Sequence, residues 1–148
     1  MATTLTNATL TVRVIEDVEL NGKKSGNTNT HKITGINEVS ERIVTSLITG
    51  TTLLSLGASA AAGTYVRDDV KYIRITNLDD TNFVRLALIN EGTDVHLKLT
   101  SLDSILLYNG SAAANDADDN TVAFSNITSI KAWADTASVD LELFVAST

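Results

Sequence analysis

The stretch VDLELFV at residues 139–145 decides the fold class. Its odd-numbered residues are all apolar and share one face of an extended chain, whereas Asp140 and Glu142 point to the other face. This two-residue period is typical of a β-strand that packs on a core with one face and meets solvent with the other. The C-terminus is therefore predicted to be a half-buried strand.

The same period recurs along the chain. Val95, Leu97 and Leu99 alternate with polar residues, and apolar residues keep one parity from Leu10 to Leu20, with a break or bulge expected at Glu16–Asp17. Further strands are predicted from apolar runs rich in β-branched residues at 70–75, 83–89, 104–108 and 127–134. Short strands separated by turns predict an all-β fold, a single-domain antiparallel β-sandwich of jelly-roll-like form that takes up residues 1–148.

The segments between these strands have turn and loop composition. Asn-Gly pairs favour tight turns, and small or polar residues favour surface loops. The predicted turns lie at Asn21-Gly22, at Asn109-Gly110, in the polar loop 78–82, and in a tight hairpin at 135–138 between the last two strands. Surface loops are expected at 23–30, 58–63 and 111–117, and residues 1–8 are expected to form a flexible N-terminal arm.

One segment fits two structures. Val39, Ile43 and Leu47 have helical spacing, with Ser40 as a candidate N-cap, but the β-branched run at 43–45 favours a strand. We favour the strand, and a short helix would leave the fold class unchanged.

Composition excludes several classes of protein. The 148 residues include no Cys, which excludes a disulfide scaffold, a thiolate metal site and a Cys nucleophile. The net charge of −7 argues against nucleic acid and anionic membrane as partners. No secretory signal or bilayer-spanning run is apparent, so we expect a protein made in the cytoplasm.

Charge is unevenly distributed. Residues 1–74 hold 8 basic and 7 acidic side chains, whereas residues 75–148 hold 3 basic and 11 acidic ones. Such asymmetry can orient contacts with a partner, although clustered Asp in solvated loops explains it more simply.

No residue pattern predicts catalysis or a cofactor. The loop 115–120 places Asp116, Asp118 and Asn120 like the first ligands of a calcium loop, but the Gly and the closing Glu are missing. His31 and His96 have no neighbour at metal-ligand spacing, and we expect His96 to face solvent or an interface. The adjacent carboxylates at 68–69 and 79–80 fit solvated loops better than an acid/base pair. We therefore predict no catalytic, cofactor or metal residues and no enzyme activity.

Trp133 and Tyr72 lie in predicted strands. Core or cross-strand aromatic packing explains both residues. A carbohydrate-binding β-sandwich would instead expose its aromatic residues, and it stays open as an alternative.

The run VKYIRITNLDDTNFV at 70–84 resembles a motif of small structural proteins of tailed bacteriophages, in which YIRITNLD…NFV gives two strands joined by a short polar turn. The segments 97–107 and 130–142 match the same layout, so the resemblance covers about residues 64–146. It implies a virion structural protein, most like a capsid decoration (cement) protein.

The resemblance implies a location on the capsid exterior, with the major capsid protein and further copies of this chain as partners. A shell with local three-fold or two-fold positions favours a homotrimer first and a homodimer second. A head–tail connector, tail or fibre-base protein is the alternative virion component.

Overall fold

The computed structural model of the protein describes residues 4–90, 94–108 and 127–148. Within these ranges the chain forms strands and one short 3-10 turn, η1 (Arg67–Asp69). Every strand predicted from alternation or from an apolar run is present, and the predicted all-β class is confirmed.

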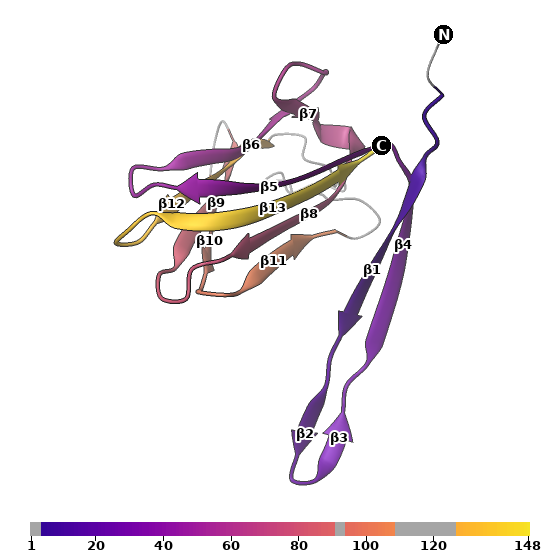
Figure 1. Ribbon diagram of the computed structural model, residues 1–148, viewed down its shortest axis with the longest axis vertical. Helices are drawn as coiled ribbons and strands as arrows, with labels where there is room; N and C mark the ends of the chain where they lie inside the picture. The colour runs from indigo at the N-terminus through magenta and orange to yellow at the C-terminus, as the bar shows by residue number, and fades with distance from the viewer. Residues whose placement is uncertain (1–3, 91–93, 109–126) are drawn as a thin grey trace.

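Two sheets form the body of the molecule (Figure 1). The four-stranded sheet has the order β11-β8-β13-β5, and its strands are β5 (Glu38–Ser46), β8 (Val70–Asn77), β11 (Ser104–Leu107) and β13 (Val139–Ser147). The five-stranded sheet has the order β10-β9-β12-β6-β7, and its strands are β6 (Thr51–Gly57), β7 (Thr64–Val66), β9 (Val84–Asn90), β10 (Val95–Leu99) and β12 (Ile127–Ala134).

The two sheets share one hydrophobic core. Residues from both sheets belong to the same buried cluster, among them Leu53 and Ile130 from one sheet and Ile73 and Leu141 from the other. In β13 the odd-numbered residues face this core, as their alternation predicts. The sheets therefore pack face to face, as in a β-sandwich.

Sequence reasoning was wrong about the connection at 135–138. It predicted a hairpin, but β12 pairs with β6 and β9 whereas β13 pairs with β5 and β8. The turn therefore passes from one sheet to the other, as does the loop 78–82 between β8 and β9. Turn composition sets where the chain reverses, but long-range packing decides which strands pair. The sheets are antiparallel except for the short parallel pair β6–β7.

An arm projects from the body (Figure 1). It is a β-hairpin made by β1 (Ala8–Ile15) and β4 (Thr28–Ile36), continued by β2 (Val18–Leu20) and β3 (Lys23–Ser25). The predicted turn Asn21-Gly22 caps it, with the φ angles of 51° and 77° typical of a two-residue hairpin turn. The polar loop expected at 23–30 is wrong, because these residues form β3 and the start of β4.

Other local predictions have clear outcomes. The strand at 39–47 is confirmed as β5, and residues 58–62 are exposed as the predicted surface loop requires. The turn at 109–110 and the loops 111–117 and 115–120 lie outside the described residues. The segment 1–8, predicted to be flexible, overlaps a strand only at its last residue, because β1 begins at Ala8.

Candidate interaction surfaces

The arm is a continuous two-stranded ribbon with one apolar side. Pairs such as Leu10–Ile33, Val12–His31 and Val14–Asn29 keep one register, and it continues to Leu20–Lys23 at the tip. Because alternate residues point to the same side, one side carries a row of apolar side chains, here called the apolar stripe: Leu10, Val12, Val14, Val18 and Leu20.

The base of the arm is anchored on the outer face of the four-stranded sheet. Val12, Ile33 and Ile36 form a second buried cluster with Tyr72 of β8 and Ala146 of β13. This cluster fixes where the arm leaves the body.

A chain of aromatic rings reinforces this anchor. His31 lies 6.2 Å from Tyr108, Tyr108 lies 5.7 Å from Tyr72, and Tyr72 lies 5.8 Å from Phe144, measured between ring centroids. Burial raises the pKa of Tyr72, so its hydroxyl stays protonated at neutral pH. The ring contacts join β4 of the arm to β8 and β13 of the sheet, and each favourable pair contributes about 1 kcal/mol.

Beyond the base of the arm, the side chains of the apolar stripe become exposed to solvent. Val12 is buried, but Val18 and Leu20 are 55% and 72% exposed. An isolated two-stranded ribbon is only marginally stable in water, and exposed apolar rows commonly mark contact surfaces. The outer half of the arm therefore has the form of a binding element.

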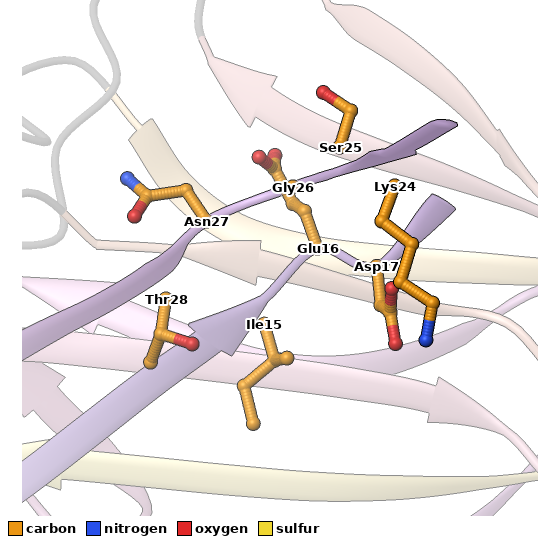
Figure 2. Close-up of a pocket in the computed structure, with 8 residues that line it drawn as sticks. All are labelled: Ile15, Glu16, Asp17, Lys24, Ser25, Gly26, Asn27 and Thr28. Carbon is orange, nitrogen blue, oxygen red and sulfur yellow. The ribbon is translucent and has the colours of Figure 1, made fainter. Parts of the chain in front are cut away.

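The two chain segments of the arm approach each other closely where β1 ends and β2 has not yet begun, the region shown in Figure 2. Here Glu16, which lies between β1 and β2, donates its amide hydrogen to the Asn27 carbonyl, which lies between β3 and β4, at 2.8 Å. Gly26 passes so close that an added Cβ would overlap the Glu16 carbonyl oxygen. An open hollow at this point is lined by Ile15, Asp17 and Lys24, among others. The strand is interrupted at Glu16–Asp17, as predicted, but the register is the same on both sides, so the interruption is not a β-bulge. Glycine at position 26 makes the close approach sterically feasible.

A second exposed surface lies on β5 and β13, next to the area covered by the arm base. We call it the β5 face; its residues are Val39, Glu41, Ile43, Asp140 and Glu142. Val39 and Ile43 are 55% and 65% exposed. A hydrogen bond from Arg74 lowers the pKa of Glu142, with a smaller contribution from Glu41. The β5 face thus combines the exposed apolar side chains of Val39 and Ile43 with the carboxylates of Glu41, Asp140 and Glu142.

The outer face of the five-stranded sheet has the opposite charge. Arg85, Lys98 and Lys131, the three basic residues of the acidic second half, all lie on it, and we call it the cationic face. Arg85 lies 4.7 Å over the ring of Trp133, and Lys98 lies 4.1 Å over that of Phe83. The charge asymmetry seen in the sequence therefore becomes a contrast between two faces of one body.

The motif at 70–84 has a structural role where the chain crosses from one sheet to the other. Asn77 is fully buried, and its amide nitrogen donates to the carbonyls of Asn82 and Thr100 at 2.9 and 3.1 Å. Its amide oxygen accepts a hydrogen bond from the Asp79 backbone at 2.9 Å. Asp79 in turn accepts backbone hydrogen bonds from Thr81 and Asn82. These bonds shape the crossing between the sheets.

The structure does not gather the residues considered as site candidates from the sequence. His96 is exposed on β10, as predicted, whereas His31 packs in the anchor of the arm. Tyr72 packs in that anchor too, and Trp133 makes the expected cross-strand contact, outside the core. Asp68–Asp69 belong to η1 and Asp79–Asp80 to the crossing loop.

The described residues hold neither a metal-binding cluster nor a membrane-spanning helix. Among these residues no three His, Cys, Asp or Glu side chains group in a way that could hold a metal ion. No helix within residues 4–90, 94–108 and 127–148 is long and apolar enough to cross a membrane.

The alternation of apolar residues from Leu10 to Leu20 predicts a strand, but it does not predict that this strand belongs to a projecting arm. The parity of the apolar stripe was recognised, but parity does not tell which half of a strand has a core beneath it. The exposed stripe was therefore missed as a contact surface.

Comparison with known proteins gives no identification: no family model matches the chain, and no curated protein or solved structure matches it either.

Proposed function

We propose that this chain is a structural protein of a tailed-bacteriophage virion that binds the outside of the capsid and bridges neighbouring capsid subunits. The arm is the observation that carries the proposal. A protein that joins neighbours must reach beyond its own footprint, and residues 13–20 extend the arm by roughly 25 Å at about 3.3 Å per residue. The exposed part of the apolar stripe supplies contact area at its end.

The motif at 70–84 supports the same proposal. Its resemblance to phage structural proteins rests on residues that here build β8, β9 and the crossing loop. The proposal includes a jelly-roll-like body, the major capsid protein as partner, and assembly as a homotrimer or, second, a homodimer. It involves no catalysis, cofactor, nucleic acid or membrane.

Bridging would stabilise a capsid by mass action. A protein that binds the assembled shell and not its free subunits shifts the equilibrium toward the shell. Capsids without this chain should therefore release their genome at a lower temperature, and adding back the purified protein should restore the wild-type temperature. The fluorescence of a DNA-binding dye, recorded while the two kinds of particle are heated, measures the temperature of genome release.

The copy number per virion tests the location. Quantitative mass spectrometry against the major capsid protein should give a ratio near one, or a simple fraction such as one third. About a dozen copies would favour the alternative of a head–tail connector, tail or fibre-base protein. Absence from the purified particle would exclude both proposals.

A carbohydrate-binding module is the second candidate, favoured by the partial exposure of Trp133. The guanidinium of Arg85 lies over the Trp133 ring, where a sugar would have to stack. Trp133→Ala should cost about 1–3 kcal/mol of folding free energy through lost cross-strand packing. A wild-type glycan-array signal that disappears in this folded variant would favour the sugar-binding function instead.

A further inference from the structure

We infer that the exposed half of the apolar stripe docks on the β5 face of a second copy of this chain. The inference rests on the proposed function and deepens it: copies seated on neighbouring capsid subunits would be joined arm to β5 face, and the arm would bridge the subunits through this contact. Its test uses purified protein alone, and so it can fail independently of any role in a virion.

The two surfaces have matching chemistry. On the arm, Val18 and Leu20 are exposed, and Lys23 pairs with Leu20 on the same side of the ribbon. On the receiving strand, Val39 and Ile43 are exposed on either side of Glu41. Docking would bury the four apolar side chains against one another and bring the Lys23 ammonium to the Glu41 carboxylate. Such alternation of apolar and charged groups also fixes the register of a contact.

The surroundings of Glu41 strengthen the match. Asp140 on the neighbouring strand β13 adds a further carboxylate to the same face, whereas the charge of Glu142 is offset by Arg74. Arg74 forms an ion pair with Glu142 at 2.8 Å, and the Arg42 guanidinium donates to the Leu53 carbonyl. The arm brings Lys23 on the side of the apolar stripe, so opposite charges would meet at the contact.

Length and position also fit a second copy. The projecting part of the arm is roughly 25 Å long, and the nine residues of β5 span roughly 30 Å. Within the described residues β5 pairs only with β13, so its other side is a sheet edge, and edge strands with exposed apolar residues are usually covered. The arm leaves the body in a direction that keeps its tip away from β5 of the same chain (Figure 1).

The contact joins different surfaces of the two copies. A heterologous contact of this kind closes into a ring when the rotation between copies is suitable, and two copies can also exchange arms reciprocally. Both arrangements use the same pairing of arm and β5 face, and each copy contributes one arm and one receiving strand.

Two single variants and one control test the pairing. Leu20→Asp changes the arm, Ile43→Asp changes the β5 face, and Leu102→Asp makes the same change at a leucine exposed in the turn between β10 and β11. All three side chains are exposed, so the folded body should be retained in each variant. Native mass spectrometry should show an oligomer for the wild type and the control. Each of the other two variants should dissociate with a dissociation constant raised about tenfold or more.

Mixing the two variants gives the sharpest test. The Ile43→Asp chain keeps an intact arm and the Leu20→Asp chain keeps an intact β5 face, so an equimolar mixture should form a heterodimer that neither variant forms alone. Lys23→Glu and Glu41→Lys should likewise each weaken association, and combining them in one chain should restore it.

Several outcomes would overturn the inference. A wild-type chain that stays monomeric at high micromolar concentration would do so, as would an oligomer unaffected by Leu20→Asp. Dissociation by Leu20→Asp but not by Ile43→Asp would place the arm elsewhere on the second copy and equally reject the pairing. A soluble oligomer missing from virions would overturn the proposed function and leave this pairing intact.

Discussion

Asn77 is the residue at which the two sheets are tied together. Its buried amide bonds three backbone groups that belong to the crossing loop and to the chain after β10. Asn77→Ala would leave these partly buried groups without their partner, and we expect a loss of about 1–3 kcal/mol. Urea unfolding followed by Trp133 fluorescence measures the loss. An unchanged midpoint would show that water replaces the amide.

Ser46, at the end of β5, should behave in the opposite way. Its hydroxyl is fully buried and has no hydrogen-bond partner among the described residues. Removing an unsatisfied buried hydroxyl removes its desolvation cost, so Ser46→Ala should leave stability unchanged or raise it by up to about 1 kcal/mol. The same unfolding assay applies, and a clear loss of stability would reveal a partner for the hydroxyl.

Asp79 links stability to pH. Backbone hydrogen bonds from Asn82 and Thr81 lower the pKa of its carboxyl in the folded protein. The unfolded chain therefore binds this proton more tightly, and the stability that the carboxylate contributes is present above about pH 4 and lost as the pH falls through the lowered value.

Asp79→Asn should consequently reduce the dependence of the unfolding midpoint on pH below about pH 4. Thermal unfolding between acidic and neutral pH measures it, with Asp80→Asn as a control for the change in charge next to it. A variant whose curve keeps the wild-type slope would show that another carboxylate controls acid stability.

At the scale of elements, the arm should be able to lose its order without unfolding the body. Gly26→Ala places a methyl group against the Glu16 carbonyl, so the ribbon must open where β1 and β4 give way to β2 and β3. The sandwich core lies in other strands and should keep its melting temperature.

Limited proteolysis measures this local effect, because opening exposes the backbone of residues 13–31 to cleavage. Gly63→Ala is the matched control: its φ of 71° is also positive, an added Cβ meets nothing within 4 Å, and it lies outside the arm. We expect faster cleavage of the arm only in Gly26→Ala. Equal cleavage of both variants would show that the arm is already open in the wild type.

The strands also show which structural features a local sequence pattern can predict. Strands were predictable because alternation is local, as in β13. Val39, Ile43 and Leu47 are four residues apart, a spacing that puts them on one side of a helix and equally of a strand, so only the β-branched run between them favoured β5. Turn 135–138 was located correctly, but the pairing of β12 and β13 with other strands depends on contacts distant in sequence.

At the scale of the whole molecule, the sequence pattern shows that the apolar residues from Leu10 to Leu20 share one side of the chain. It does not show that those beyond Val14 are exposed to solvent. Their exposure depends on where the four-stranded sheet ends, which no local pattern encodes. The cationic face was hidden in the same way, because Arg85, Lys98 and Lys131 lie far apart in sequence and meet only through the pairing of β9, β10 and β12.

The two outer faces of the body should have separate partners. If the β5 face receives the arm of a second copy, the cationic face on the other side of the core remains free, and under the proposed function we expect it to contact the capsid. Lys98→Glu combined with Lys131→Glu reverses the charge of that face without touching the arm or β5. Because complementary charge speeds association and selects partners, this variant should bind capsids about tenfold more weakly at low salt, with a smaller difference at high salt.

Cosedimentation with capsids stripped of this chain measures that binding, and native mass spectrometry checks that the oligomer is unchanged. Lys23→Glu on the arm is the control for a change of charge elsewhere, and it should affect self-association more than capsid binding. Capsid binding that is unaffected by the double variant would mean that the shell is contacted through another surface. The arm would then be the first to test, because it projects from the body (Figure 1).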